Sequence, residues 1–412
     1  MPPVKRRLDR AEGSRLRYAL MTDVSKRMLG VQSPVIPVVG TLVRDNPGTI
    51  SLGQGIVHYP PPTEAVEAAA ACTADPANHI YRAVDGIPAL RNALRAKLAD
   101  DNGLVIGDEH GLHVCAGGNM AFMNGLLAIA DPGNEIILPT PYYFNHEMAT
   151  VMASCTPITV ATDSNYMLQP DAIAAAITPR TRAVVTVSPN NPSGAVYPEE
   201  MVREVNRICR DNGLYHIHDE AYEYFTYGAA RHFSPGSIQD AAPYTISLYS
   251  LSKAYGMAGW RMGYMVYPAH LHEAIRKIQD TILICPPIPS QYAALAALGM
   301  GRAYCENWLE EYAEVRTVFK QAMASIDNIC DVPNADGAFY FLLRVHTDMD
   351  AMTLVQKLVL EHAVAAIPGS AFGLTNGCYL RVAYGALRKD SAIEGVQRLT
   401  TGLRALVSSS NN

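Results

Sequence analysis

The residues with the clearest chemical potential lie between Ser250 and Arg261, where one lysine and one arginine stand among hydroxyl and glycine residues. A lysine amine can form a Schiff base with an aldehyde. The hydroxyls of Ser250 and Ser252, the fork of Arg261 and glycine-permitted turns can enclose a phosphate dianion. A lysine taken alone is usually a solvated surface residue. These neighbours instead favour Lys253 as the anchor of an aldehyde cofactor that carries a phosphate, and pyridoxal 5'-phosphate matches that description.

Polar side chains also follow two predicted strands at the points where the strands end. The strand at 183–187 runs into a turn that contains Asn191, and the strand at 214–217 runs into a segment with Asp219 and Tyr222. An ordinary Pro- and Gly-containing turn and an acidic helix cap are the structural alternatives. Beside a pyridine ring, the Asp219 carboxylate can keep the ring nitrogen protonated so that the ring accepts electrons. Asn191 and Tyr222 can then share the phenolate oxygen of the same ring.

A third strand, at 112–115, opens through Gly117, Gly118 and Asn119 into a predicted helix. Backbone N–H groups at the start of a helix favour a phosphate, and glycines allow it to approach closely. A Gly-Gly turn alone is weak evidence for such a site. Together with the serines and arginine of the first segment, it completes one candidate phosphate cup.

The elements that position these residues have the pattern of an α/β protein. Short apolar runs alternate with helical patterns, such as those at 119–129 and 198–212, from about residue 64 to residue 306. The runs are mostly continuous, as expected for a sheet covered on both faces, and predict strands at 112–115, 135–138, 183–187, 214–217, 245–249 and 261–266. The remainder predicts a second, smaller α/β domain, with a helix at 306–326 and strands at 337–345 and 379–384. Because open α/β sheets bind ligands at the carboxyl ends of their strands, the candidate residues should meet at one edge.

Composition limits the partners and the compartment. The 412 residues are 49% apolar and 17% charged, which is typical of a globular enzyme with more than one domain. The net charge of −6 argues against nucleic acid and membrane as main partners, so small molecules are expected. The eight cysteines lack the spacing of a zinc site or a disulfide framework, so we expect no metal and reduced thiols. No apolar leader or long apolar run is present, which favours a cytoplasmic protein.

The segment 5–27 carries eight basic side chains. It predicts a solvated helical arm, with an organelle-targeting segment as the alternative.

Four motifs in this order resemble the fold type I, pyridoxal-phosphate-dependent aminotransferases of class I/II. They are Asn191-Pro-Ser-Gly194, Asp219-Glu-Ala-Tyr222, Ser250-Leu-Ser-Lys253 with Arg261, and Pro368-Gly-Ser-Ala-Phe372-Gly before Tyr-Leu-Arg381. The resemblance covers about residues 22–405. It implies a large domain with a mostly parallel seven-stranded sheet and a smaller α/β domain. We therefore predict an N-terminal arm with part of the small domain at 1–62, a large cofactor-binding domain at 63–305 and a C-terminal small domain at 306–412.

The resemblance also implies a role for each matching residue on the cofactor. Lys253 corresponds to the Schiff-base lysine and general base, and Asp219 to the partner of the ring nitrogen. Asn191 and Tyr222 correspond to the partners of the phenolate oxygen. The phosphate contacts correspond to Gly117, Gly118, Asn119, Ser250, Ser252 and Arg261.

Further matches concern the ring face and the substrate. Tyr143 matches the aromatic residue that stacks on the ring, with the adjacent Tyr142 as its rival. Arg381 matches the arginine that binds the substrate α-carboxylate through two parallel N–H bonds, a geometry that lysine cannot supply. Gly55 and Asn191 belong to the same substrate subsite.

Two further segments imply a homodimer with shared sites. Tyr81 matches a tyrosine that contacts the phosphate of the neighbouring subunit, and the segment 281–287 also faces the partner. In that segment Cys285 takes what is a serine position in the family, and the family's Gly-Glu-Pro-Asp-Phe stretch reads Gly55-Ile-Val-His-Tyr59 here. Because residues 281–287 include no basic side chain, neutral, aromatic or sulfur-containing amino donors are favoured.

The implied activity is transfer of an amino group from an L-amino acid to a 2-oxo acid, by a ping-pong mechanism through pyridoxamine phosphate. Other reactions use the same cofactor site, because pocket geometry selects which bond breaks. The alternatives are β-elimination by a C–S lyase, cyclopropane formation as in an ACC synthase, and oxidase-type chemistry. A non-catalytic regulator that senses the cofactor is a further alternative, although it would need an attached DNA-binding domain.

Overall fold

The large sheet determines where the candidate residues lie. The computed structural model describes residues 24–408. The strands of this sheet are β2 (His110–Cys115), β3 (Glu135–Thr140), β4 (Thr156–Ala161), β5 (Thr181–Val187), β6 (Tyr215–Asp219), β7 (Thr245–Ser250) and β8 (Gly263–Pro268). They form a seven-stranded sheet in the order β2-β8-β7-β6-β5-β3-β4. β8 is antiparallel to both of its neighbours and the other pairs are parallel, so the predicted mostly parallel sheet is confirmed.

The sequence predicts this sheet with one omission and one shift. β4 has no predicted counterpart, because it is an edge strand whose residues are mostly exposed or half-buried and do not form an apolar run. The strand predicted at 261–266 begins at Gly263 instead. Arg261 has a left-handed backbone with φ of +54° and belongs to the preceding turn.

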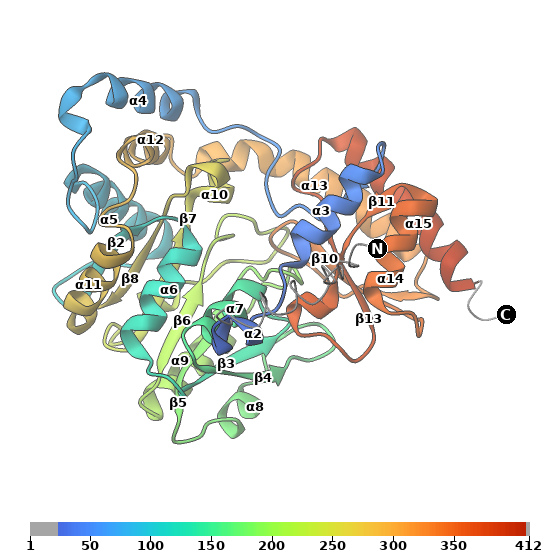
Figure 1. The fold of residues 1–412 in the computed structure, drawn as a ribbon, viewed down its shortest axis with the longest axis horizontal. Coiled ribbons are helices and arrows are strands. Elements are labelled where there is room, and N and C mark those ends of the chain that lie inside the picture. The colour runs from blue at the N-terminus through green and yellow to red at the C-terminus, as the bar shows by residue number, and fades with distance from the viewer. Residues whose placement is uncertain (1–23, 409–412) are drawn as a thin grey trace, which may run out of the picture.

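Helices cover both faces of the sheet, which explains why its strands are continuous apolar runs. The covering helices include α5 (Pro88–Asn102), α6 (Gly118–Ile129), α11 (His272–Ile282) and α12 (Ile288–Gly299). Along β8, Val266 packs into the same core as α5 and α12. Its neighbour Met265 packs on the opposite face, in the core that contains residues of α6 and α11. Figure 1 shows these helices around the sheet, at the end of the molecule away from the chain's C-terminus.

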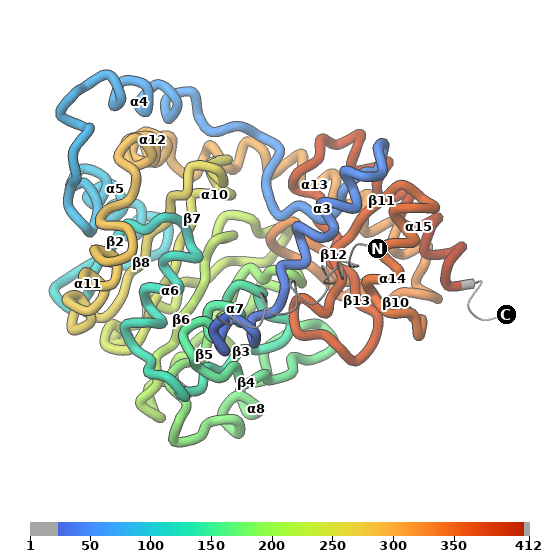
Figure 2. The backbone as a smooth tube through the Cα atoms, viewed as in Figure 1, coloured from blue at the N-terminus to red at the C-terminus, as the bar shows by residue number. Residues whose placement is uncertain are grey.

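The C-terminal part of the chain forms a second group of elements around an antiparallel sheet of order β12-β13-β10-β9. Its elements are α13 (Ala303–Ala324), β9 (Cys330–Asp331), β10 (Tyr340–Val345), α14 (Ala351–His362), β11 (Val364–Ala365), β12 (Ile367–Pro368), β13 (Cys378–Ala383) and α15 (Lys389–Ser408). The N-terminal elements α3 (Val35–Asp45) and β1 (Ile50–Ser51) lie with this group, and β1 pairs with β11 in parallel. Figure 2 shows the blue N-terminal segment running beside the red C-terminal segment. The domain boundaries at 62/63 and 305/306 stay a prediction.

The remaining helices are α2 (Lys26–Gly30), α4 (Thr63–Ala74), α7 (Phe144–Met152), α8 (Pro170–Ala175), α9 (Glu199–Asp211) and α10 (Leu251–Ala254). All eight cysteines lie in the described part of the chain and are free thiols, seven of them buried. Within residues 24–408, no helix combines the length and apolarity needed to cross a membrane. Most of the basic segment 5–27, including the predicted arm, lies outside the described residues.

Candidate active site

The predicted site residues meet where strand ends converge. Parallel strands bring their carboxyl ends to one edge of a sheet, and the antiparallel β8 begins at that same edge. A cavity of about 480 Å³ opens there. Every predicted site residue lines it except Gly117 and Tyr81. The wall consists of Ile36, Gln54, Gly55, Ile56, Gly118, Asn119, Tyr143, Phe144, Val187, Asn191, Asp219, Ala221, Tyr222, Ser250, Ser252, Lys253, Ala258, Arg261, Tyr340 and Arg381.

Lys253 is held in the short helix α10 directly after β7. The Ser250 hydroxyl caps this helix by accepting a hydrogen bond of 3.2 Å from the Ser252 N–H. The Lys253 Nζ donates to the Gly55 carbonyl at 2.6 Å. The pKa of the amine is lowered from 10.5 to about 8, mainly by burial and also by the positive charges of Arg381 and Arg261, while the negative charge of Asp219 opposes them. The amine is therefore poised to lose its proton near neutral pH.

Asp219 ends β6 and points its carboxylate into the cavity. One oxygen, Oδ1, accepts from the Ala221 N–H at 3.1 Å, and Oδ2 lies 3.2 Å from Nε2 of His146. His146 is buried and its ring stacks on Phe122 at 4.2 Å. His146 was not predicted from the sequence, although it lies three residues after Tyr143, which is the N-cap of α7. Together these contacts fix the direction of the carboxylate.

Tyr143 lines the cavity, whereas its rival Tyr142 does not. The Tyr143 hydroxyl donates to Asn119 Oδ1 at 3.2 Å and accepts from Asn145 Nδ2 at 2.7 Å. Tyr142 packs against Gly373, where an added Cβ would lie 2.5 Å from its ring. The structure therefore presents Tyr143 as the aromatic face available to a ligand.

Arg381 lies on β13, is fully buried and lines the cavity. Its Nη1 donates to Asn191 Oδ1 at 3.0 Å and its Nη2 donates to the Gly53 carbonyl at 2.7 Å. The guanidinium lies over the rings of Tyr340 and Phe372, at 4.8 and 5.1 Å from their centroids. Its Nε has no hydrogen-bond partner among the described residues. Because Asn191 accepts through its oxygen, the donor end of its amide remains for a ligand.

The cavity floor beside β2 and β8 has the chemistry of an anion site. Gly118 begins α6, so the unpaired N–H groups of the first turn face this end. The preceding Gly117 has φ of +84°, and an added Cβ there would lie 2.3 Å from Nη2 of Arg261. Gly117 thus lies outside the wall but makes room for the guanidinium. Ser250 and Ser252 complete this group of donors.

Tyr222 and Tyr340 form a buried phenol pair on the wall. Their hydroxyl oxygens are 2.5 Å apart. Burial raises the pKa of Tyr222 well above its usual value, and the neighbouring Tyr340 raises it further. Burial also raises the pKa of Tyr340, to about 12, while the positive charge of Arg381 opposes that rise. Tyr340 was not predicted from the sequence, because it occupies what reads as an apolar position at the start of a strand in the C-terminal part.

Tyr81 lies away from this cavity and is 74% exposed, next to Ile80 at 62%. It lines a separate surface hollow of about 610 Å³ together with Cys285 and residues 286–289. The two segments expected to face a partner subunit therefore lie on one surface. In a single chain, Tyr81 is not part of the Lys253 site.

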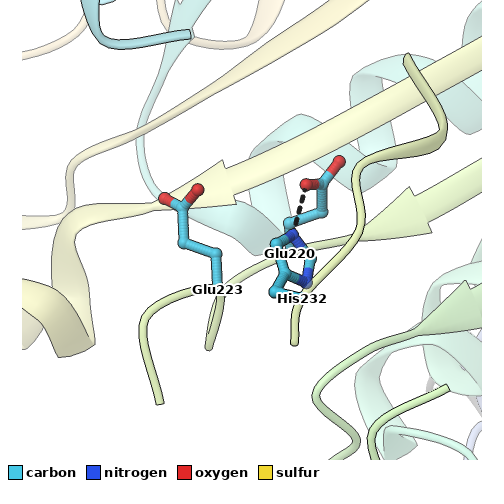
Figure 3. A group of neighbouring side chains, drawn as sticks. All are labelled: Glu220, Glu223 and His232. Atoms are coloured by element: carbon cyan, nitrogen blue, oxygen red, sulfur yellow. Dashed lines mark hydrogen bonds and ion pairs between the residues drawn. The ribbon is translucent and has the colours of Figure 1, made fainter. Parts of the chain in front are cut away.

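The face of β6 opposite Asp219 holds a cluster of charged side chains. Glu220, Glu223 and His232 have ligand atoms close enough together to hold a metal ion. His232 Nε2 lies 2.8 Å from Glu220 Oε2, and Figure 3 marks this contact but none between the Glu223 carboxylate and the other two side chains. Lys97 Nζ lies 2.5 Å from that carboxylate and takes the place of a cation there. We therefore interpret the cluster as an ion-paired and hydrogen-bonded support next to the strand that carries Asp219.

The donor set fits pyridoxal 5'-phosphate. Lys253 offers an amine of lowered pKa for the aldehyde, and Asp219 offers an oriented carboxylate for the pyridine nitrogen. The helix start at Gly118, with Arg261 and the serines, offers donors for the phosphate. The unpartnered Nε of Arg381 leaves the guanidinium with bonding capacity for a carboxylate.

Comparisons with known proteins agree with this site. The sequence profile described as "Aminotransferase class I and II" matches residues 47–399. The aromatic aminotransferase ISS1 of Arabidopsis thaliana is 33% identical over 93% of this chain and 97% of its own length. An aspartate aminotransferase of Streptomyces avermitilis is 30% identical over 97% of both chains. The solved structure of a mutant Thermus thermophilus aspartate aminotransferase superposes with a TM-score of 0.85 and 29% identity, covering 93% of this chain and 100% of that one.

Proposed function

The chain belongs to the class I and II aminotransferases, which use pyridoxal 5'-phosphate, and we propose that its amino donor is a neutral, aromatic or sulfur-containing L-amino acid. It is a transaminase whose substrates are an amino acid and a 2-oxo acid. We further propose that the reaction is ping-pong and that the residues around Lys253 take the roles expected from the sequence.

The proposed roles follow from the charges on the wall. The cofactor, when bound, supplies an electron sink next to the substrate Cα. Asp219, fixed by the Ala221 N–H and by His146, would keep the ring nitrogen protonated. Arg381 would bind the α-carboxylate and so orient the Cα–H bond. The Lys253 amine, with its lowered pKa, would act as the general base that takes up the Cα proton and later releases it.

The proposed class of amino donor rests on the small number of cationic side chains on the cavity wall. Its only cationic side chains among the described residues are Lys253, Arg261 and Arg381. Arg261 belongs to the phosphate end and Arg381 to the α-carboxylate, so none is left to pair with a side-chain carboxylate. The wall also has an apolar portion, to which Ile36, Ile56 and Phe144 contribute. An unpaired carboxylate would be costly to bury there, whereas an aromatic or thioether side chain would gain apolar contact.

A donor panel tests the proposal. The holoenzyme is assayed with phenylalanine, tyrosine, methionine, leucine, aspartate and glutamate, each with two 2-oxo acid acceptors. We expect kcat/KM for the best neutral donor to exceed that for aspartate by at least about tenfold, the value of one unpaired charge–polar contact. A preference for aspartate or glutamate would contradict the donor class. The names of the relatives make both classes necessary in the panel, because one is an aromatic and one an aspartate aminotransferase.

The same assay separates transamination from the alternative reactions. Transamination yields the 2-oxo acid and the new amino acid in equal amounts, and double-reciprocal plots at several acceptor concentrations are parallel. Release of ammonia, of a thiol or of hydrogen peroxide in place of the new amino acid would favour a lyase or oxidase reaction.

We also propose a homodimer in which Tyr81 contacts the cofactor phosphate of the other subunit. Its exposed ring lies with Ile80 and the segment at 285–289 on one surface, as expected for a face that a partner covers. A hybrid dimer of a Lys253→Ala chain with a Tyr81→Ala chain tests this sharing. Sharing predicts one intact site per hybrid, so mixing the two variants restores activity to about half the wild-type value per hybrid. If Tyr81 acted within its own subunit, mixing would restore nothing.

A further inference from the structure

Tyr340 contacts or adjoins three residues of the site, although it was not among the residues predicted from the sequence. It is the first residue of β10, it is fully buried, and its hydroxyl lies 2.5 Å from that of Tyr222. The guanidinium of Arg381 lies 4.8 Å from the centre of its ring. An added Cβ at Gly55 would lie 2.7 Å from the Tyr340 oxygen, so the glycine leaves the space that this hydroxyl occupies.

The hydrogen count of the phenol pair limits what each hydroxyl can do. Each tyrosine has one hydroxyl hydrogen, and only one of the two can lie between the oxygens. The other is free to point into the cavity, because both residues line it. If Tyr340 donates to Tyr222, the hydrogen of Tyr222 is the free one. If Tyr222 donates, the free hydrogen belongs to Tyr340.

We propose that Tyr340 is a positioning residue that donates its hydroxyl hydrogen to Tyr222 and thereby aims the Tyr222 hydrogen at the phenolate oxygen of the cofactor. This inference rests on the proposed role of Tyr222. Two observations support the direction. The positive charge of Arg381 over the Tyr340 ring makes that phenol the better donor of the two. A hydroxyl that accepts one hydrogen bond also donates a stronger one, so the hydrogen bond from Tyr340 would strengthen the hydrogen bond that Tyr222 donates.

The pH dependence of the visible absorbance of the lysine-bound cofactor can be used to measure the effect of these two hydrogen bonds. A donor at the phenolate oxygen stabilises the deprotonated form of the bound cofactor, so a weaker donor moves the pH midpoint of the band upward. We expect Tyr340→Phe to raise the midpoint by about half a pH unit, the scale of one neutral hydrogen bond, and Tyr222→Phe to raise it more. Both variants keep their rings, and therefore the packing of Tyr340 against Phe339. Tyr227→Phe, which removes a buried hydroxyl bonded to the Ala338 carbonyl, is the matched control and leaves the midpoint unchanged.

A second measurement needs no cofactor. Urea unfolding of the apoprotein is compared for wild type, Tyr222→Phe, Tyr340→Phe and the double variant. Because the two hydroxyls are mutual partners, we expect the second substitution to change the unfolding constant about fivefold less when the first is present. Additive effects would overturn the direct pairing.

The direction of the bond has its own decisive outcomes. If Tyr340→Phe raises KM for amino acids while the absorbance midpoint stays unchanged, Tyr340 donates to the substrate next to Arg381 and the proposal is wrong. If Tyr222→Phe also leaves the midpoint unchanged, the role of Tyr222 fails and the proposal fails with it. The donor panel and the product assay test the proposed function independently of these variants. Failure of the proposed hydrogen bond from Tyr340 to Tyr222 can therefore be distinguished from failure of the proposed function.

Discussion

The lowered pKa of Lys253 is the site property that most directly allows measurement. With a pKa of about 8, half of the Lys253 amines are neutral at pH 8. An ordinary lysine with a pKa near 10.5 is only about 0.3% neutral at that pH, so Lys253 should react with an amine-selective reagent up to about 150-fold faster per accessible amine. The assay labels the apoprotein for short times at several pH values and quantifies the Lys253 peptide by mass spectrometry. The peptide of the exposed Lys277 from the same digest provides the reference rate.

Two substitutions with opposite signs test the cause. Arg381→Leu removes a positive charge that lowers the pKa of Lys253, so the pKa rises and labelling at pH 8 slows. The decrease stays well below 150-fold, because burial is the largest cause of the lowered pKa and the variant keeps it. Asp219→Asn removes the negative charge that raises the same pKa, so labelling at pH 8 becomes faster. A midpoint near 10.5 in the wild type, or the same direction of change in both variants, would refute the electrostatic account.

Three further outcomes follow from the same contacts. Because the folded-state pKa of Lys253 lies below its unfolded value, its charge destabilises the apoprotein below pH 8. Lys253→Met should therefore raise the free energy of unfolding at pH 7 by up to about 3 kcal/mol, and the gain should vanish toward pH 10.5, as urea unfolding can show. Arg381→Ala should raise KM about 100-fold for every amino donor, because each carries the α-carboxylate; an effect on one donor only would contradict this role. Gly117→Ala, which places a Cβ against Arg261 at a φ of +84°, should weaken cofactor binding about tenfold by fluorescence titration, whereas Gly107→Ala, with open space around it, should not.

The sequence predicts those parts of the site that follow a strand end. Lys253, Asp219 and Asn191 each come shortly after a continuous apolar run, and the runs belong to parallel strands with both faces covered. Since parallel strands end at a common edge, the local pattern is enough to bring these side chains together. The pattern fails at β4 because an edge strand does not have to be apolar, and at Arg261 because a left-handed residue at the end of a turn leaves no trace in hydrophobicity.

His146 and Tyr340 illustrate two different limits of the sequence. His146 could have been predicted, because it lies three residues after Tyr143 and a buried imidazole needs a partner such as Asp219. Tyr340 could not have been predicted, because nothing in the sequence of β10 distinguishes a phenol bonded to Tyr222 from one that only packs against Phe339. That distinction depends on how the C-terminal sheet sits over the end of β6, more than a hundred residues away in the chain.

The position of the C-terminal sheet relative to β6 also determines which site residues Tyr340 contacts. Tyr222 follows β6 of the large sheet, while Tyr340 and Arg381 lie on the paired strands β10 and β13, two positions apart in the register, with Tyr340 opposite Ala383 and Arg381 opposite Leu342. A relative displacement of these two groups of elements would therefore change both the 2.5 Å contact between the phenols and the position of the guanidinium that we propose to bind the α-carboxylate. Tyr340 touches both partners at once, because its ring lies under the Arg381 guanidinium and its hydroxyl bonds to Tyr222. The two ends of the site, cofactor oxygen and substrate carboxylate, are then coupled through one ring.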